Sequence, residues 1–140
     1  MRTISPRNIV AAIAASMAAL FVAAAGAAAG AATLEVPLAG MGGSSEHGVA
    51  VLKASGAKTV VTIKVSGGTA DPQPSHFHTG TCDKYSPRPL YMLQSIVNGE
   101  STTTLDVPMD VLTKGDLVIN VHRSLTDIAT VAACGVAKEH

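Results

Sequence analysis

Two histidines separated by a single residue are the first feature of this sequence that could support chemistry. In His76-Phe77-His78 the two imidazoles would project from one face of an extended segment, so they can converge on one metal ion. His122 ends the mostly apolar strand candidate 118–122 and is a third candidate in a chain with five histidines. Three imidazoles suit copper or zinc. The alternative interpretation is that these histidines make ordinary hydrogen bonds and hold no metal.

Other side chains could orient or complete such a metal site. Each histidine ligand needs its second ring nitrogen held by a carbonyl or a carboxylate, and the candidate partners are Asp83, Asp127 and Asn120. The candidates for a further ligand are His47, Met41, Met92 and Met109. A thioether ligand would favour Cu(I), although core packing is the simpler expectation for each methionine. Packing is also the expectation for the two tyrosines, Tyr85 and Tyr91.

Short strands separated by turn residues must position these groups. The segment 59–66 is the clearest strand, because every second residue from Val61 to Val65 is apolar and the residues between them are polar. The other expected strands are 34–38, 49–52, 76–78, 91–97, 101–107, 117–122 and 130–136. Seven or eight short strands with regular turns predict an all-β domain, a sandwich or a barrel.

One turn and two short helical segments are also predicted. Asn98-Gly99 is the strongest short signal for a hairpin and lies between two expected strands. The segments 110–113 and 124–127 could each form one turn of helix. No segment of the chain has a convincing amphipathic helical period.

The N-terminal segment predicts export. Arg2 and Arg7 precede an apolar run over 9–25, and the small residues that follow offer several A-x-A cleavage sites. A membrane anchor is the alternative, but this alanine-rich run is at the lower limit of length for a span. We therefore expect residues 1–32 to be a signal peptide, cleaved between about 25 and 32, and 33–140 to be one secreted or periplasmic domain without a membrane span.

Cys82 and Cys134 are the two cysteines of the chain. An even count in an exported chain predicts a disulfide, and two free thiols in a metal site are the alternative. The loop of about 50 residues that it would close corresponds to roughly 4 kcal/mol in the chain-entropy model.

Charge and motif content exclude several functions. Without Arg2 and Arg7 the domain has 8 basic and 10 acidic residues, a net charge of −2 with neutral histidines. This balance gives no basic footprint for nucleic acid and no polybasic membrane patch. A G-x-S-x-G motif, a phosphate-binding glycine loop and a supported pair of catalytic carboxylates are all missing from the sequence.

Four short motifs, taken in order, resemble the copper/zinc superoxide dismutase family. They are HFHTGTC over 76–82, Val121-His122, ACGV over 133–136, and an early hairpin over 47–67 that begins HGVAV. The resemblance covers essentially the whole expected domain. It implies a flattened Greek-key β-barrel or sandwich, copper bound by His76, His78 and His122, and a Cys82–Cys134 disulfide.

The sequence also departs from the pattern of that family. The family's metal loop carries a histidine that bridges copper and zinc, two further zinc histidines and a zinc aspartate, whereas positions 79–121 hold no histidine. A zinc site of the family type is therefore not expected. The family's arginine three residues before the last cysteine, which attracts superoxide, is replaced by Val131.

Three functions remain open from the sequence. The first is a copper-only enzyme that dismutes superoxide without zinc. The second is a copper-binding or delivery protein of the cell envelope that has no turnover. The third is a structural β module that holds no metal.

Overall fold

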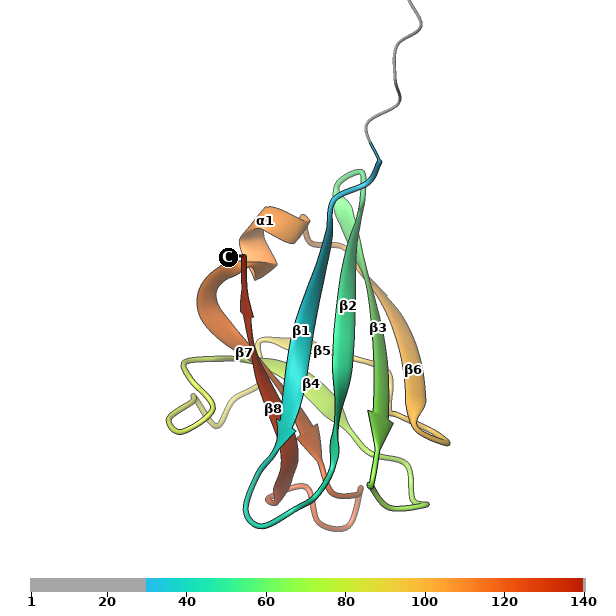
Figure 1. Ribbon diagram of the computed structural model, residues 1–140. Helices are drawn as coiled ribbons and strands as arrows, with labels where there is room; N and C mark the ends of the chain where they lie inside the picture. The colour runs from blue at the N-terminus through green and yellow to red at the C-terminus, as the bar shows by residue number, and fades with distance from the viewer. Residues whose placement is uncertain (1–29, 140) are drawn as a thin grey trace, which may run out of the picture.

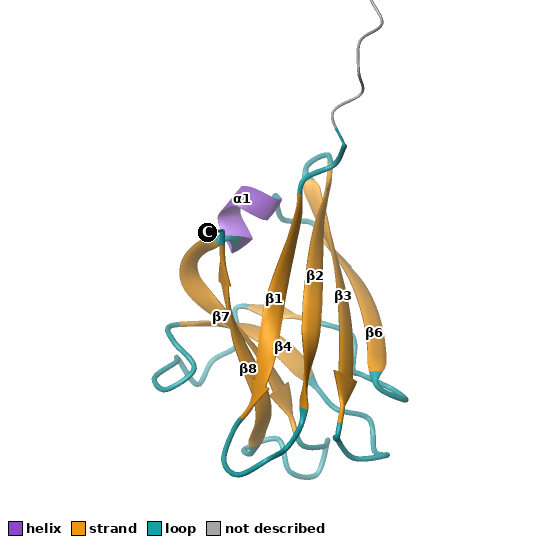
Figure 2. Ribbon diagram, in the orientation of Figure 1, coloured by secondary structure: helices purple, strands orange, loops and turns teal. Residues whose placement is uncertain are grey.

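Eight strands make up most of the part of the chain described by this computed structural model, residues 30–139. They are β1 Thr33–Gly40, β2 His47–Ser55, β3 Lys58–Ser66, β4 Ser75–Thr79, β5 Tyr91–Met92, β6 Glu100–Leu105, β7 Lys114–His122 and β8 Val131–Lys138. One helical turn, α1 (Met109–Leu112), precedes β7. The predicted all-β class is confirmed (Figure 2). Residues 1–29 of the predicted signal peptide lie outside the described residues.

All strand pairs are antiparallel and belong to one curled sheet. The strand order is β5-β4-β7-β8-β1-β2-β3-β6, and the sheet bends around a shared interior (Figure 1). The edge strands β5 and β6 are consecutive in the sequence. They are connected through a turn at Asn98-Gly99, where both residues have positive φ, and the flanking residues Val97 and Glu100 form a β-bridge.

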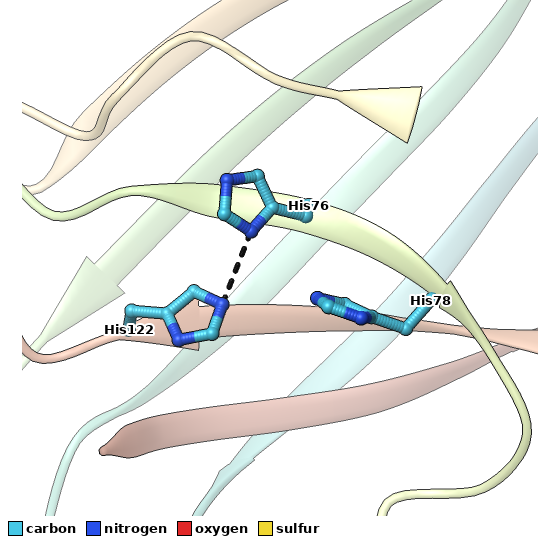
Figure 3. A group of neighbouring side chains, drawn as sticks. All are labelled: His76, His78 and His122. Atoms are coloured by element: carbon cyan, nitrogen blue, oxygen red, sulfur yellow. Dashed lines mark hydrogen bonds between the residues drawn. The ribbon is translucent and has the colours of Figure 1, made fainter. Parts of the chain in front are cut away.

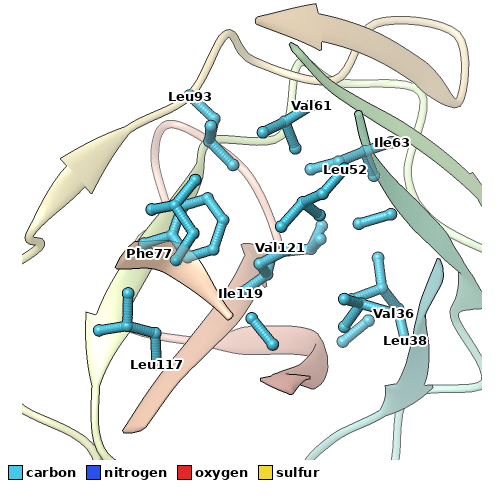
Figure 4. Packing of buried hydrophobic residues seen from close by; sticks show 14 of the residues in the cluster. Val36, Leu38, Leu52, Val61, Ile63, Phe77, Leu93, Leu117, Ile119 and Val121 are labelled. Atoms are coloured by element: carbon cyan, nitrogen blue, oxygen red, sulfur yellow. The ribbon is translucent and has the colours of Figure 1, made fainter. Parts of the chain in front are cut away.

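The apolar core fills the inner face of this sheet. Alternate residues of β3, Val61 and Ile63, are buried as the sequence pattern predicts. Phe77 of β4 is fully buried and packs with Ile119 and Val121 of β7 in the same cluster (Figure 4). Because Phe77 points inward, its neighbours His76 and His78 point to the opposite face of the sheet.

Two expected elements differ from the structure. The segment 91–97 is not one strand, because its backbone changes partners: Leu93 N donates to Ser75 O, whereas Gln94 N donates to Thr103 Oγ1. The segment 124–127 forms no helix, since the Asp127 amide donates to the side chain of Ser124 at 3.0 Å. By contrast, the predicted helical turn near 110–113 is present as α1.

The helical content of the described residues is small. Within 30–139, no helix has the length and apolar character needed to cross a membrane.

Candidate metal centre

Two neighbouring strands bring the three candidate histidines together. His76 and His78 are on β4, and His122 is the last residue of the adjacent β7. Their rings come from both strands toward one point on the outer face of the sheet (Figure 3). All three residues are buried. The alternation of β4 produces this placement, since Phe77 takes the core side.

The ring nitrogens have a spacing that suits one metal ion. One nitrogen from each ring can be chosen so that all three lie within 4.8 Å of one another. The closest pair is His76 Nδ1 and His122 Nε2, at 3.1 Å. Two nitrogens that each bind a tetrahedral metal ion at about 2.0–2.1 Å are roughly 3.3 Å apart. The observed pair therefore needs little movement to share an ion.

His78 is oriented by a backbone carbonyl. Its Nδ1 lies 2.8 Å from Ser86 O, and because a carbonyl oxygen only accepts, Nδ1 carries the proton. The other nitrogen, Nε2, then has a free lone pair, and it is buried without a hydrogen-bond partner. The Tyr85 ring packs against His78 with ring centroids 5.2 Å apart. This arrangement leaves Nε2 as the ligating atom of His78.

Burial keeps His76 and His122 neutral. Loss of solvent around His76, together with the neighbouring His122 and His78, lowers its pKa to about 4. The pKa of His122 is also lowered by burial. The Ile128 carbonyl raises the pKa of His122, although it makes no hydrogen bond of good geometry with the buried Nδ1. The neighbouring His78 lowers it. The neutral imidazoles expected at pH 7 are the form that binds a metal.

A tight loop holds the groups that cover His78. Within the loop 80–86, Thr81 and Lys84 exchange backbone hydrogen bonds, and Ser86 N donates to Thr79 O at 2.8 Å. Gly80 has φ +124°, and a Cβ there would collide with the backbone of Lys84. Only glycine fits this position without displacement. The loop thus places the Ser86 carbonyl beside the imidazole.

A disulfide fixes this loop to the sheet. Cys82 is bonded to Cys134 of β8, with Cα atoms 5.8 Å apart, so the predicted disulfide is confirmed. Val118, Val131 and Cys134 form a small apolar cluster on the outer face, with Met41, Cys82 and Tyr85 packed against it. Val131 is buried there, at the position where the resembled family has arginine.

The other candidate ligands lie in different places. Met92 is directly opposite His76 in the β4–β5 pair and is 63% exposed. His47 is exposed and its Nδ1 lies 3.0 Å from Ser45 O, so it is not part of the histidine cluster. Met109 is buried in the main core, and Met41 packs beside the disulfide.

The residues proposed from the sequence as partners of the ring nitrogens do not include Ser86, the partner of His78 in the structure. Asp83 is exposed, and Asp127 accepts a hydrogen bond from Thr130. Asn120 is completely buried, but neither atom of its carboxamide has a hydrogen-bond partner. The sequence pattern could not indicate Ser86, since it acts through a backbone carbonyl that every residue type carries.

A buried, hydrogen-bonded pair of side chains supports the end of β7. Gln73 Nε2 donates to Glu46 Oε2 at 2.9 Å and to the backbone oxygen of His122 at 3.1 Å. Glu46 and Gln73 are both buried. This pair could not be predicted from the sequence, because a glutamate and a glutamine far apart in the chain carry no signal of contact.

The chemistry available at this site is metal coordination by three neutral imidazoles. No family model, no curated protein and no solved structure matches the chain. The site is therefore interpreted from its own geometry. Three nitrogen donors without a thiolate or a carboxylate suit a divalent ion of the copper or zinc type.

Proposed function

We propose that this protein binds one copper ion through His76, His78 and His122. The observation that carries the proposal is the convergence of three buried ring nitrogens within 4.8 Å of one another. Two further facts support it: His78 Nε2 is buried without a partner, and burial lowers the pKa of His76 to about 4. A buried nitrogen without a partner is costly, and a bound metal ion would remove that cost.

The identity of the metal rests on the donor set and on the resemblance to copper/zinc superoxide dismutases. Imidazoles bind both copper and zinc, and Cu²⁺ binds more tightly than Zn²⁺ at a given nitrogen site. The described segment 79–121 supplies no histidine for a second ion. We therefore propose a copper site without a neighbouring zinc site, in an exported protein.

The strand order supports a Greek-key fold of the dismutase type. In such a motif three consecutive strands are followed by a fourth that returns beside the first. Here β4, β5 and β6 are consecutive and β7 pairs with β4, although β5 and β6 are the two edge strands and do not pair with each other. The segment between β5 and β6 also contacts β6, through Gln94 N and Thr103 Oγ1 at 2.8 Å. This contact lies where a closed barrel would need β5 and β6 to meet.

Dismutation of superoxide is the reaction that we propose for the copper form. Copper bound at the site would supply one-electron redox chemistry. The protein would hold the ion between β4 and β7, orient His78 through Ser86 and keep the rings of His76 and His122 neutral through burial. Solvent would supply the protons, since the described chain has no bridging histidine.

Copper storage or delivery without turnover is the second candidate. The observation that favours it is the burial of all three histidines, which limits the approach of a substrate. The buried Val131 also leaves no arginine at the position where the resembled family attracts superoxide. In this case the same residues would bind copper, and the assay below separates the two functions.

A metal titration tests the proposal. We expect the purified protein, with its disulfide formed, to bind one equivalent of Cu(II) with a visible absorption band, and Zn(II) to compete for the same equivalent. His76→Ala and His122→Ala should each weaken binding at least tenfold, because each removes one of three ligands. The matched control is His47→Ala, which removes an exposed histidine outside the cluster and should leave the affinity unchanged.

The outcomes separate the three functions. Copper that binds and is lost in the cluster variants, with superoxide consumed by the loaded protein, supports the enzyme. The same binding without turnover supports storage or delivery. No copper binding, or copper binding that neither cluster substitution weakens, would contradict the proposed site, and the structural module would then be the better interpretation.

A further inference from the structure

Asn120 is a buried polar residue beside the three histidines. The hydrogen-bonding groups of its own side chain are unused. It is completely inaccessible, and among the described residues neither Oδ1 nor Nδ2 has a hydrogen-bond partner. Buried carboxamides are nearly always hydrogen-bonded, and an unpaired one destabilises the fold. An apolar residue would suit this position in β7 better, unless the carboxamide has a partner that is not part of the protein.

The strand register places Asn120 next to the histidine cluster. It is directly opposite His76 across the β4–β7 pair and two residues before His122 on β7. Residues opposite each other on antiparallel strands project from the same face, with Cβ atoms about 4.5–5.5 Å apart. On its other side Asn120 is opposite Cys134 of β8. Its carboxamide thus lies between the disulfide and the metal ligands.

Among the described residues, the neighbours of Asn120 make no hydrogen bond with its carboxamide. Val118 precedes it on the same face of β7 and packs with Cys134 in the small apolar cluster. The facing nitrogens of His76 and His122 are 3.1 Å from each other. The Asn120 carboxamide shares a row of side chains with His76 and Cys134 and has no hydrogen-bond partner among the described residues. The metal's own non-protein ligand is the partner that this position offers.

We infer that Asn120 hydrogen-bonds the small oxygen or anion ligand that completes the coordination of the copper ion. The inference rests on the proposed function. The carboxamide suits this role, because Nδ2 can donate to an anion and Oδ1 can accept from a water molecule. Three histidines leave at least one coordination position for such a ligand. Asn120 is therefore a positioning residue, and the class of ligand that it selects is a small anion or water.

Asn120→Val tests this inference, because valine suits a strand and makes no side-chain hydrogen bond. The metal-free variant should melt a few degrees above the wild type, since two unpaired polar atoms leave the interior. In the Cu(II) form, azide serves as the probe of the open position. Its affinity should fall roughly tenfold, and the electron paramagnetic resonance spectrum of the copper ion should change.

The control is a buried unpaired polar atom on the other face of the sheet. Ser101 of β6 has a buried Oγ without a partner, and it lies opposite the core residue Ile63, on the inner face, whereas the three histidines lie on the outer face. Ser101→Ala should leave the azide affinity and the copper spectrum unchanged. Asn120→Ala is the second variant if the valine does not fit, and it should show the same loss of azide affinity.

Three results would overturn the inference about Asn120. Wild-type azide affinity and an unaltered copper spectrum in the Asn120 variants would overturn the inference while leaving the copper site in place. A metal-free Asn120→Val protein that melts below the wild type would show a structural role and would also overturn it. A wild-type protein that binds no copper overturns the proposed function and this inference together.

Discussion

The three histidines combine two properties that oppose each other in a metal-free protein. Burial favours the neutral form of His76 and His122, which is the form a metal needs, but it leaves His78 Nε2 and His122 Nδ1 without hydrogen-bond partners. The Ser86 carbonyl satisfies only Nδ1 of His78. A cluster of this kind is more stable with an ion than without one, so binding of the metal should raise the free energy of unfolding.

Acid should destabilise the metal-free protein through His76. Its pKa is about 4 in the folded state and about 6.5 when unfolded, so the unfolded state binds more protons between these values. Stability should be constant above about pH 6.5 for this group and should fall by at most about 3 kcal/mol as the pH drops to 4. Urea unfolding at pH 7.5, 5.5 and 4.5 measures the slope.

Two variants identify the source of that slope. His76→Gln should make the slope shallower and leave the part that comes from His122, whose pKa burial also lowers. His47→Gln, which changes an exposed histidine, should retain the full slope. Equal slopes in the two variants would show that His76 is not the group responsible.

At the scale of the elements, the end of β7 depends on a buried hydrogen-bonded pair. Gln73 links the Glu46 carboxylate, just before β2, to the backbone of His122. Gln73→Leu should cost about 2–3 kcal/mol of unfolding free energy, since it leaves a buried carboxylate and a carbonyl without this donor. It should also weaken copper binding, because His122 loses a backbone support.

The matched control is Gln94→Leu, the same substitution at an exposed position. It should change stability by no more than about 0.5 kcal/mol. Urea unfolding of the two variants measures the difference. A Gln73→Leu protein as stable as Gln94→Leu would show that the Glu46–Gln73 pair contributes little.

The sequence predicts elements whose signal is local. β3 follows its apolar alternation to within one residue, and the Asn98-Gly99 turn follows from residue types that accept positive φ. The segment 91–97 could not be predicted correctly, because Leu93 and Gln94 bond to different neighbours in space. Local pattern carries no information about such a change of partner.

The candidate site also has residues that could be predicted from the sequence and features that could not. The histidines at 76, 78 and 122 could be selected from residue type and spacing, because alternation on a strand decides which face they occupy. The orientation of His78 by Ser86 and the burial of Asn120 without partners could not. Both depend on how the loop 80–86 packs over the outer face and on how β8 pairs with β7, which are properties of the tertiary structure.

At the scale of the whole molecule, the Cys82–Cys134 disulfide joins stability to the metal centre. The bond links residues 52 apart in sequence, for which the chain-entropy model gives about 4 kcal/mol. It also holds the loop that carries Tyr85 and Ser86 over His78. Loss of the bond should therefore lower the affinity for copper as well as the free energy of unfolding.

The double variant Cys82→Ser with Cys134→Ser tests this coupling without a reductant that would bind copper. We expect a loss of roughly 4 kcal/mol in urea unfolding. At a temperature where the variant is still folded, copper affinity should fall, since His78 loses the carbonyl that fixes its ring. Unchanged affinity in a folded but less stable variant would show that the hydrogen bonds of the loop 80–86 hold Ser86 in place without the disulfide.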